Sequence, residues 1–149
     1  MDDAIRKQIL SILERHGDMT LATLREDGFP QATTVTYVND GLTLYFGCDP
    51  SSQKAQNIAR HPKVSATIDQ PQEDWDAIEG VSLGGLATRV TDPGEIAKIV
   101  ELMRAKYEQA ADYYVADAID AIAFFRIEPV AISVLDYAKG FGHTELVTL

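Results

Sequence analysis

The chain has 149 residues, of which 46% are apolar and 24% are charged, and its formal charge is −10. This length and composition predict one folded domain over residues 1–149. The excess of acidic residues disfavours nucleic acid and anionic membrane surfaces as partners, because both attract basic proteins. No apolar run reaches the roughly 18 residues of a membrane span. The first residues also lack a secretory signal pattern, so we expect a cytoplasmic protein.

The N-terminal half predicts one helix, three strands and a second helix. Apolar residues recur at helical spacing until Gly17, where the first helix should end. Strands are expected over 19–25, 30–38 and 41–47. A hairpin turn at 39–41 should join the last two strands. The next segment predicts a short helix with Ser51 or Ser52 as its N-cap.

The C-terminal half continues with strands and two further helical segments. Strands are expected over 63–69, 78–90, 121–127 and 129–137. Gly84 and Gly85 lie inside one of them, where paired glycines indicate a bulge or a close approach of another backbone. A helix should begin at Asp92, a second helical stretch should cover roughly 108–118, and 139–149 should be irregular.

These elements predict a fold that is mainly β with flanking helices. Regular alternation of strands and helices is lacking, so a parallel doubly wound sheet is the weaker alternative. About seven strands with mostly short, hairpin-like connections favour a six- to seven-stranded antiparallel β-barrel.

Standard catalytic and metal-binding patterns are absent from the sequence. His16, His61 and His143 are far apart and lie in no recognisable metal-binding frame, so no metal site is expected. His16 should close the first helix, where a positive charge would suit the dipole. Cys48 is interpreted as a small filler residue, and a reactive thiol is the less favoured alternative.

A local reversal of charge follows the third expected strand. Residues 50–68 contain no carboxylate, but they include Lys54, Arg60 and Lys63. A helix that begins at Ser52 would direct unpaired backbone N–H groups and the positive end of its dipole outward. Such a cluster suits a small anion such as a phosphate. An ordinary capped helix with a surface lysine is the competing interpretation.

The run DGFPQATTVTYVNDGLTLYFGCDPSSQKAQNIARHPKVSATI resembles the pyridoxamine 5′-phosphate oxidase-like family of FMN-binding split barrels. The resemblance lies in a proline-containing second strand, a hairpin that ends in an aromatic residue, a Ser-x-Lys turn and a helix that ends in a His-Pro step. It continues in Gly85–Leu86–Ala87 and in FFRIEPVAISVLDYAKGFGH. The likeness covers roughly 17–143, and it implies a split β-barrel that forms a homodimer with two flavin sites in its interface.

The resemblance also implies which residues hold the flavin. The phosphate is expected on Ser52, Gln53 and Lys54. The isoalloxazine ring is expected along the second strand and at the end of the hairpin, on Gln31, Thr33, Thr34, Val35, Thr36, Phe46 and Gly47. In a homodimer, the partner's Trp75 loop or its KGFG tail would cover the ring.

The chain departs from the family in two ways. Many members have arginine where this chain has Gln31 and Gln53, and the loss of guanidinium–phosphate pairs should weaken binding. The chain is also shorter than a pyridoxamine-phosphate oxidase and lacks the arginine-containing C-terminal segment of that enzyme. Vitamin B6 synthesis is therefore not expected.

The favoured function is a flavin-dependent oxidoreductase that acts on a small substrate, with FMN supplying the hydride or electron chemistry. One alternative is a non-catalytic flavin or haem binder or sensor in the same fold. Haem would need an axial ligand, for which His61 and His143 are the candidates. A deazaflavin-dependent reductase is the other alternative.

Overall fold

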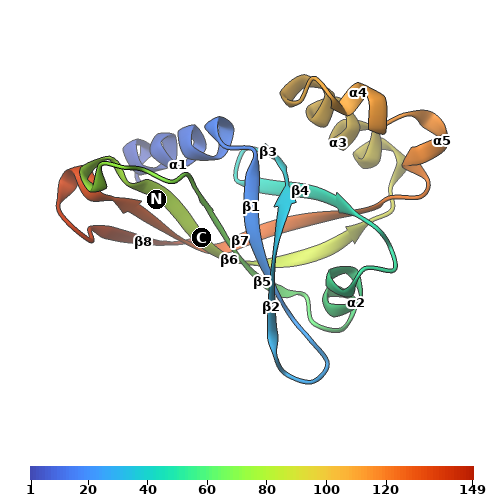
Figure 1. The fold of residues 1–149 in the computed structure, drawn as a ribbon, viewed down its shortest axis with the longest axis horizontal. Helices are drawn as coiled ribbons and strands as arrows, with labels where there is room; N and C mark the ends of the chain where they lie inside the picture. The colour runs from blue at the N-terminus through green and yellow to red at the C-terminus, as the bar shows by residue number, and fades with distance from the viewer.

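The computed structural model describes residues 1–149 as one curled antiparallel sheet with helices around it (Figure 1). The strands are β1 (Asp18–Leu24), β2 (Pro30–Thr36), β3 (Val38–Asp40), β4 (Thr43–Cys48), β5 (Lys63–Asp69), β6 (Glu79–Val90), β7 (Ala123–Asp136) and β8 (Thr144–Thr148). The helices are α1 (Asp3–Arg15), α2 (Gln53–Arg60), α3 (Pro93–Lys106), α4 (Ala110–Tyr113) and α5 (Ala116–Ile119), with short 3₁₀ turns η1 (Trp75–Ala77) and η2 (Tyr137–Lys139). None of these helices is long and apolar enough to cross a membrane.

The sheet closes into a barrel because one segment of the chain occupies both of its edges. Neighbouring strands follow the order β2-β1-β5-β6-β7-β4-β3, and β8 pairs with β7 outside this path. β2 and β3 are consecutive and are separated only by Tyr37, so the first and last strands are two parts of one bent segment. The resulting circuit of six strands confirms the predicted antiparallel split barrel.

Two packed cores hold the barrel and its helices together. Along β5, Val64, Ala66 and Ile68 are buried while the residues between them are exposed, as alternation predicts for a strand with one face inward. The larger core joins the barrel interior to the apolar face of α1. The smaller core lies under α3, around Ile99 and Met103. Burial of each such side chain contributes roughly 1.5–3 kcal/mol.

The paired glycines of β6 mark a bulge, as predicted. The register between β6 and β7 shifts between Gly84 and Gly85, and Val130 on β7 is the extra residue without a partner. A Cβ atom at Gly85 would lie 2.8 Å from the carbonyl oxygen of Glu128, so the two backbones are too close for a side chain. The long strands therefore bend at this point.

Two strand predictions are wrong in detail. The strand expected over 30–38 is broken at Tyr37, whose backbone N–H donates to the Gly17 carbonyl at 3.1 Å instead of continuing a ladder. The strands expected over 121–127 and 129–137 are one strand, β7. A proline is tolerated inside it because Pro129 lies at the bulge, where regular pairing is interrupted.

The expected irregular tail and the last helical stretch are also corrected. Thr144–Thr148 form β8, an edge strand whose only buried residue is Val147, so its sequence shows little of the alternation that marks a strand. The helical stretch expected over 108–118 consists of two four-residue helices, α4 and α5, interrupted at Tyr114 and Val115.

His16 closes α1 as predicted, but the expected charge interaction with the helix dipole is wrong. The side chain is only 6% exposed, and its Nδ1 atom has no hydrogen-bond partner. Burial and the adjacent Arg15 lower the pKa of His16 below its ordinary value of 6.5. The imidazole is therefore neutral at pH 7 and acts as a packing residue.

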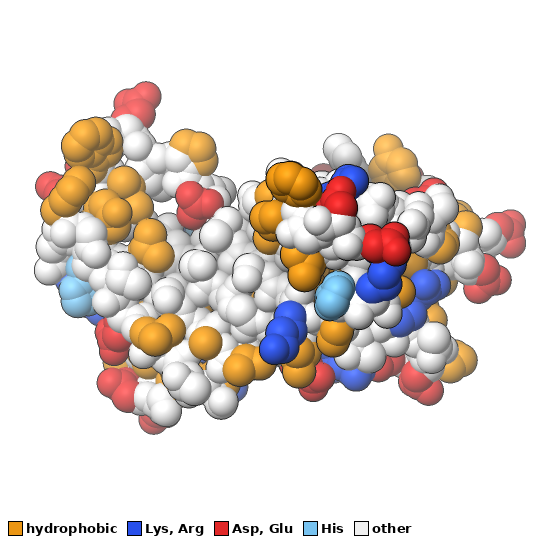
Figure 2. All heavy atoms as spheres, turned by 90° about the horizontal axis from the view of Figure 1, so that it is seen from below, with side chains coloured by type: hydrophobic (Ala, Val, Ile, Leu, Met, Phe, Trp, Pro, Cys, Tyr) orange, Lys and Arg blue, Asp and Glu red, His pale blue; other side chains and the backbone are white.

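The face of the sheet beside the β1–β2 hairpin is open. Figure 2 shows this side of the molecule as a shallow hollow between two lobes, filled mainly by polar side chains and backbone, with scattered apolar side chains around it. The exposed apolar residues of β6, β7 and β8 include Leu86, Val130 and Leu146. Part of the apolar surface of the sheet is thus left uncovered within one chain.

Candidate functional site

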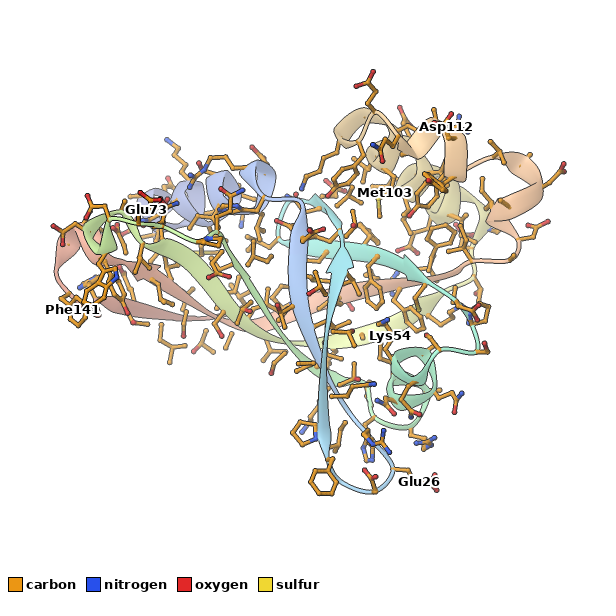
Figure 3. The ribbon with its side chains drawn as sticks, viewed as in Figure 1. Glu26, Lys54, Glu73, Met103, Asp112 and Phe141 are labelled. Atoms are coloured by element: carbon orange, nitrogen blue, oxygen red, sulfur yellow. The ribbon has the colours of Figure 1, made fainter.

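The predicted phosphate position lies where β4 ends and α2 begins. The N-cap of α2 is Ser52, whose Oγ accepts a hydrogen bond from the backbone N–H of Ala55 at 3.4 Å and donates to Cys48 Sγ at 3.5 Å. Lys54 is in the first turn of the helix, where no acidic residue balances it. Figure 3 labels Lys54 beside α2. The first turn of α2 therefore combines a helix N-terminus with a positive side chain.

A second positive charge, which the sequence did not reveal, comes from β6. Arg89 pairs across the sheet with Phe125, which in turn pairs with Phe46 on β4. Its guanidinium carbon lies 5.7 Å from the centre of the Phe125 ring. Neither Arg89 nor Lys54 forms an ion pair with a carboxylate, in contrast to most other arginines of the chain. Only the register of three strands brings Arg89 here, so no local pattern could have identified it.

The Cys48 thiol lies within the influence of both cations. Burial raises the pKa of Cys48, while the hydrogen bond from Ser52 and the positive charges of Lys54 and Arg89 act in the opposite direction. The Asp49 carboxylate adds to the effect of burial, so both signs of charge act on the thiol at the end of β4. Because burial has the largest effect on the pKa of Cys48, the thiol is protonated at neutral pH. This agrees with the interpretation of Cys48 as a filler residue.

A buried amide network fixes α2 against the barrel. Asn57 is fully buried, and its Nδ2 donates to Thr23 Oγ1 at 3.0 Å and to Gln31 Oε1 at 3.3 Å. Its Oδ1 accepts from Gln53 Nε2 at 2.7 Å. Both glutamines that stand in place of family arginines are therefore hydrogen-bonded to one asparagine. An asparagine between Ala55 and Ile58 on the buried face of α2 was the available sequence signal, and it was missed.

The predicted ring-binding residues of β2 divide between the two faces of the strand. Val35 is buried, and Gln31 and Thr33 on the same face are half-buried. Thr34 and Thr36 point to the exposed face. The Thr33 hydroxyl is buried without a hydrogen-bond partner, which marks an unsatisfied polar position on the inner face. The structure therefore does not bring all five residues to one surface.

The two predicted residues at the end of the hairpin differ in accessibility. Phe46 is fully buried in the barrel, where its ring stacks on Phe125 with centroids 5.2 Å apart, so its side chain is not available to a ligand. Gly47 packs against Ile122, and a Cβ atom at this position would lie 2.9 Å from Ile122 Cγ2. The glycine therefore permits a close contact between β4 and the chain that precedes β7.

Trp75 lies far from Lys54 within one chain. It belongs to η1 and packs on Phe141 with ring centroids 5.9 Å apart, and Phe141 in turn contacts Tyr137. Figure 3 shows the labelled Phe141 at the left tip of the molecule and Lys54 in its right half, beside α2. The rings of Trp75 and Phe141 are 65% and 76% exposed. A single chain cannot place this aromatic pair over its own α2.

The two histidines considered as haem ligands are also separated. His61 is the exposed C-cap of α2, one helix length away from Lys54, and His143 lies in the turn before β8. No group of three or more His, Cys, Asp and Glu side chains gathers in a metal-binding arrangement.

An apolar pocket of about 330 Å³ lies between the end of β2, helices α3 and α4, and the segment that precedes β7. Eight residues of β2, α3, α4 and the adjoining turns line it: Thr36, Met103, Tyr107, Gln109, Ala110, Tyr113, Tyr114 and Ile122. Thr36 belongs to the predicted ring-binding strand, and Ile122 touches Gly47. The sequence did not reveal this pocket, because its walls depend on how α4 and the turns around it lie beside α3 and β2.

Comparison with known proteins agrees with this architecture. Residues 5–136 match the family described as pyridoxamine 5′-phosphate oxidase. General stress protein 26 of Bacillus subtilis (strain 168) is 33% identical over 60 residues, which make up 40% of this chain and 42% of that protein. The chain therefore matches less than half of the length of this curated relative.

Two solved structures extend the likeness to nearly the whole chain. A candidate pyridoxamine 5′-phosphate oxidase from Listeria innocua is 26% identical, with a TM-score of 0.73 over 89% of this chain and 98% of that one. A haem-binding protein from Mycobacterium smegmatis is 24% identical, with a TM-score of 0.76 over 96% of this chain and 56% of that one. Together with the split barrel, the match over residues 5–136 shows that the chain belongs to the pyridoxamine 5′-phosphate oxidase family.

Proposed function

We propose that the chain binds FMN beside β2 and the end of β4, with the flavin phosphate at the start of α2. The observation that carries the proposal is that Lys54, in the first turn of α2, and Arg89 both act on the Cys48 thiol while neither forms an ion pair with a carboxylate. In a chain with a formal charge of −10, two cations without ion-pair partners around one thiol support an anion site there. The first-turn N–H groups of α2 add further donors.

The residues present fit a flavin phosphate, and they include Lys54, which the family resemblance implies, together with Arg89, which it does not. Gln31 and Gln53 are held by Asn57, so they position α2 and do not have to supply a charge. In this proposal, Arg89 provides the guanidinium that other members have at those positions. The unpartnered Thr33 hydroxyl supports a polar ligand group along β2.

The activity that we propose is that of a flavin-dependent oxidoreductase. Bound FMN would supply hydride or electron transfer, and the protein would supply binding, orientation and exclusion of water.

We also propose that the chain forms a homodimer whose interface covers the flavin. The exposed apolar residues Leu86, Val130 and Leu146 support an interface on the open sheet. The exposed Trp75–Phe141 pair would then be available to the flavin site of the second copy. Sedimentation at micromolar concentration should give a dimer, and a monomer of 16.4 kDa at all concentrations would contradict it.

The competing function is haem binding, favoured by the likeness of fold to a haem-binding protein. His61 would be the axial ligand at α2. The absorption spectrum of the purified protein separates the two functions. Flavin bands in the near-ultraviolet and blue support our proposal, whereas a Soret band that disappears in His61→Ala supports the alternative. If the protein is purified without a chromophore, titration with FMN and with haem makes the same distinction.

A further inference from the structure

None of the side chains that line the apolar pocket near Gly47 is ionised. Six of its eight lining residues are apolar or aromatic, and the other two are Thr36 and Gln109. A charged ligand would lose its hydration there without gaining a partner. An aromatic ring, in contrast, would pack against Tyr107, Tyr113 and Tyr114. The chemistry of the walls therefore selects a flat and uncharged ligand.

Hydroxyl groups are the polar contacts that the pocket offers. The Tyr107 hydroxyl donates to the Gly17 carbonyl at 2.8 Å, which fixes that ring as a wall. The hydroxyls of Tyr113 and Tyr114 donate to no group of the chain, so they are free to donate to a ligand oxygen. Burial raises the pKa of Tyr114, which keeps its hydroxyl protonated at neutral pH. The pocket is a mainly apolar hollow that is open to solvent, and it offers two free hydroxyl donors.

The position of the pocket connects it with the proposed flavin site. Thr36 is the last residue of β2, along which the ring is expected, and it lines the pocket. Ile122 contacts Gly47 at the end of β4 and lines the pocket as well. A ligand in the pocket would therefore lie next to the edge of a flavin placed against Thr36 and Gly47.

We propose that this pocket is the substrate subsite of the protein, and that it takes an uncharged aromatic molecule of one or two rings with a hydrogen-bond-accepting oxygen. The volume of about 330 Å³ lies at the lower end of ordinary small-ligand pockets. The assignment as substrate subsite rests on the proposed flavin function. Binding to the pocket itself does not, because its walls are complete in the single chain.

The test uses 2-naphthol as the uncharged probe and naphthalene-2-sulfonate as its charged counterpart. Methyl NMR of the full-length protein without flavin gives the position of the bound probe. Addition of 2-naphthol should shift the methyl resonances of Met103 and Ile122, which line the pocket, and should leave those of Met19 and Ile68 in the barrel core unchanged. The sulfonate should bind at least about tenfold more weakly, because its charge would be desolvated.

Matched variants separate this pocket from general hydrophobic binding. Tyr113→Ala, at an exposed rim position, should weaken 2-naphthol binding about three- to tenfold. Phe141→Ala removes a similarly exposed ring at the other end of the molecule and should have no effect. Gln109→Lys should raise affinity for the sulfonate, because it places a positive charge on the pocket wall.

Three outcomes would overturn the proposal. The first is equal binding of the two probes, and the second is a set of shifts that does not include Met103 and Ile122. The third is displacement of 2-naphthol by FMN, which would assign the pocket to the flavin itself. A protein that binds 2-naphthol here but fails to bind FMN would leave the pocket intact and refute the flavin function separately.

Discussion

The two regions that flank the end of β4 differ in the chemistry of their side chains: the region at the start of α2 is polar, and the region beside α3 and α4 is apolar. On the α2 side, Lys54 and Arg89 lack ion-pair partners, and the buried Asn57 network lies beneath α2. On the α3–α4 side, tyrosines and aliphatic residues enclose a pocket without an ionised group. Figure 1 shows α2 and the α3–α5 group on either side of the sheet end. The two sides therefore suit different ligand groups: an anionic group beside α2 and an uncharged aromatic ring beside α3 and α4.

The attachment of α2 to the barrel should depend most on Asn57. Asn57→Ala would leave the buried Thr23 hydroxyl and the half-buried amides of Gln31 and Gln53 without their partner, and a buried polar group without a partner costs roughly 1–3 kcal/mol. We expect the free energy of unfolding to fall by about 3 kcal/mol in a urea titration. The control is Gln56→Ala on the exposed side of the same helix, which should change it by less than about 0.5 kcal/mol. Equal effects would mean that the network does not fix α2.

Gly47 joins the two sides, so a side chain there should disturb both. The Cβ atom of Gly47→Ala would lie 2.9 Å from Ile122 Cγ2, and we expect a loss of about 1–3 kcal/mol of stability. Replacing Ile122 by leucine removes the branched methyl group that causes this clash. In a double-mutant cycle, Ile122→Leu should therefore recover much of the loss. Additive losses in the cycle would show that the two residues are not in contact.

His16 should make the free energy of unfolding fall as the pH is lowered into the mildly acidic range. Burial and Arg15 lower its pKa in the folded state, with Lys106 acting in the same direction and Asp69 and Glu79 opposing. The unfolded chain therefore binds the proton more readily. The contribution of His16 is complete above its ordinary pKa of 6.5 and is lost as the pH falls below it, by about 1.4 kcal/mol per unit of pKa difference.

Urea titrations of wild type and His16→Gln between pH 7.5 and 5 test this, because glutamine does not titrate in that range. The stability of the variant should change less with pH than that of wild type. A steeper dependence in the variant would show that the imidazole gains rather than loses affinity for its proton on folding.

The rate at which Cys48 is alkylated should report whether a phosphate is bound at the start of α2, without any substitution in the chain. It is the chain's one cysteine, and burial raises its pKa, so alkylation by iodoacetamide at pH 8 should be slower than that of an exposed thiol. A phosphate beside Ser52 should slow the reaction further, by about two- to fivefold on a simple shielding argument. FMN should show this protection and riboflavin much less. Equal protection by both would move the phosphate away from Cys48.

The sequence predicted those parts of the fold that are determined by residues close together in the chain. The barrel followed from strand alternation such as that of Val64, Ala66 and Ile68, and the start of α2 from a serine N-cap. Residues that act through distant pairing were missed. Arg89 reaches the site through the register of β6, β7 and β4, and the edge strand β8 carries almost no apolar alternation. Local patterns contain neither kind of information.

The most direct test of the account compares FMN and riboflavin binding in wild type, Lys54→Ala and Arg89→Ala. A charged hydrogen bond is worth roughly 1.5–3 kcal/mol, so each variant should lose about ten- to a hundredfold in FMN affinity. Riboflavin, which lacks the phosphate, should bind all three proteins nearly equally. Lys63→Ala, an exposed lysine at the start of β5, serves as the charge control and should change neither affinity. Equal losses for FMN and riboflavin, or no loss for either, would contradict a phosphate site at the start of α2.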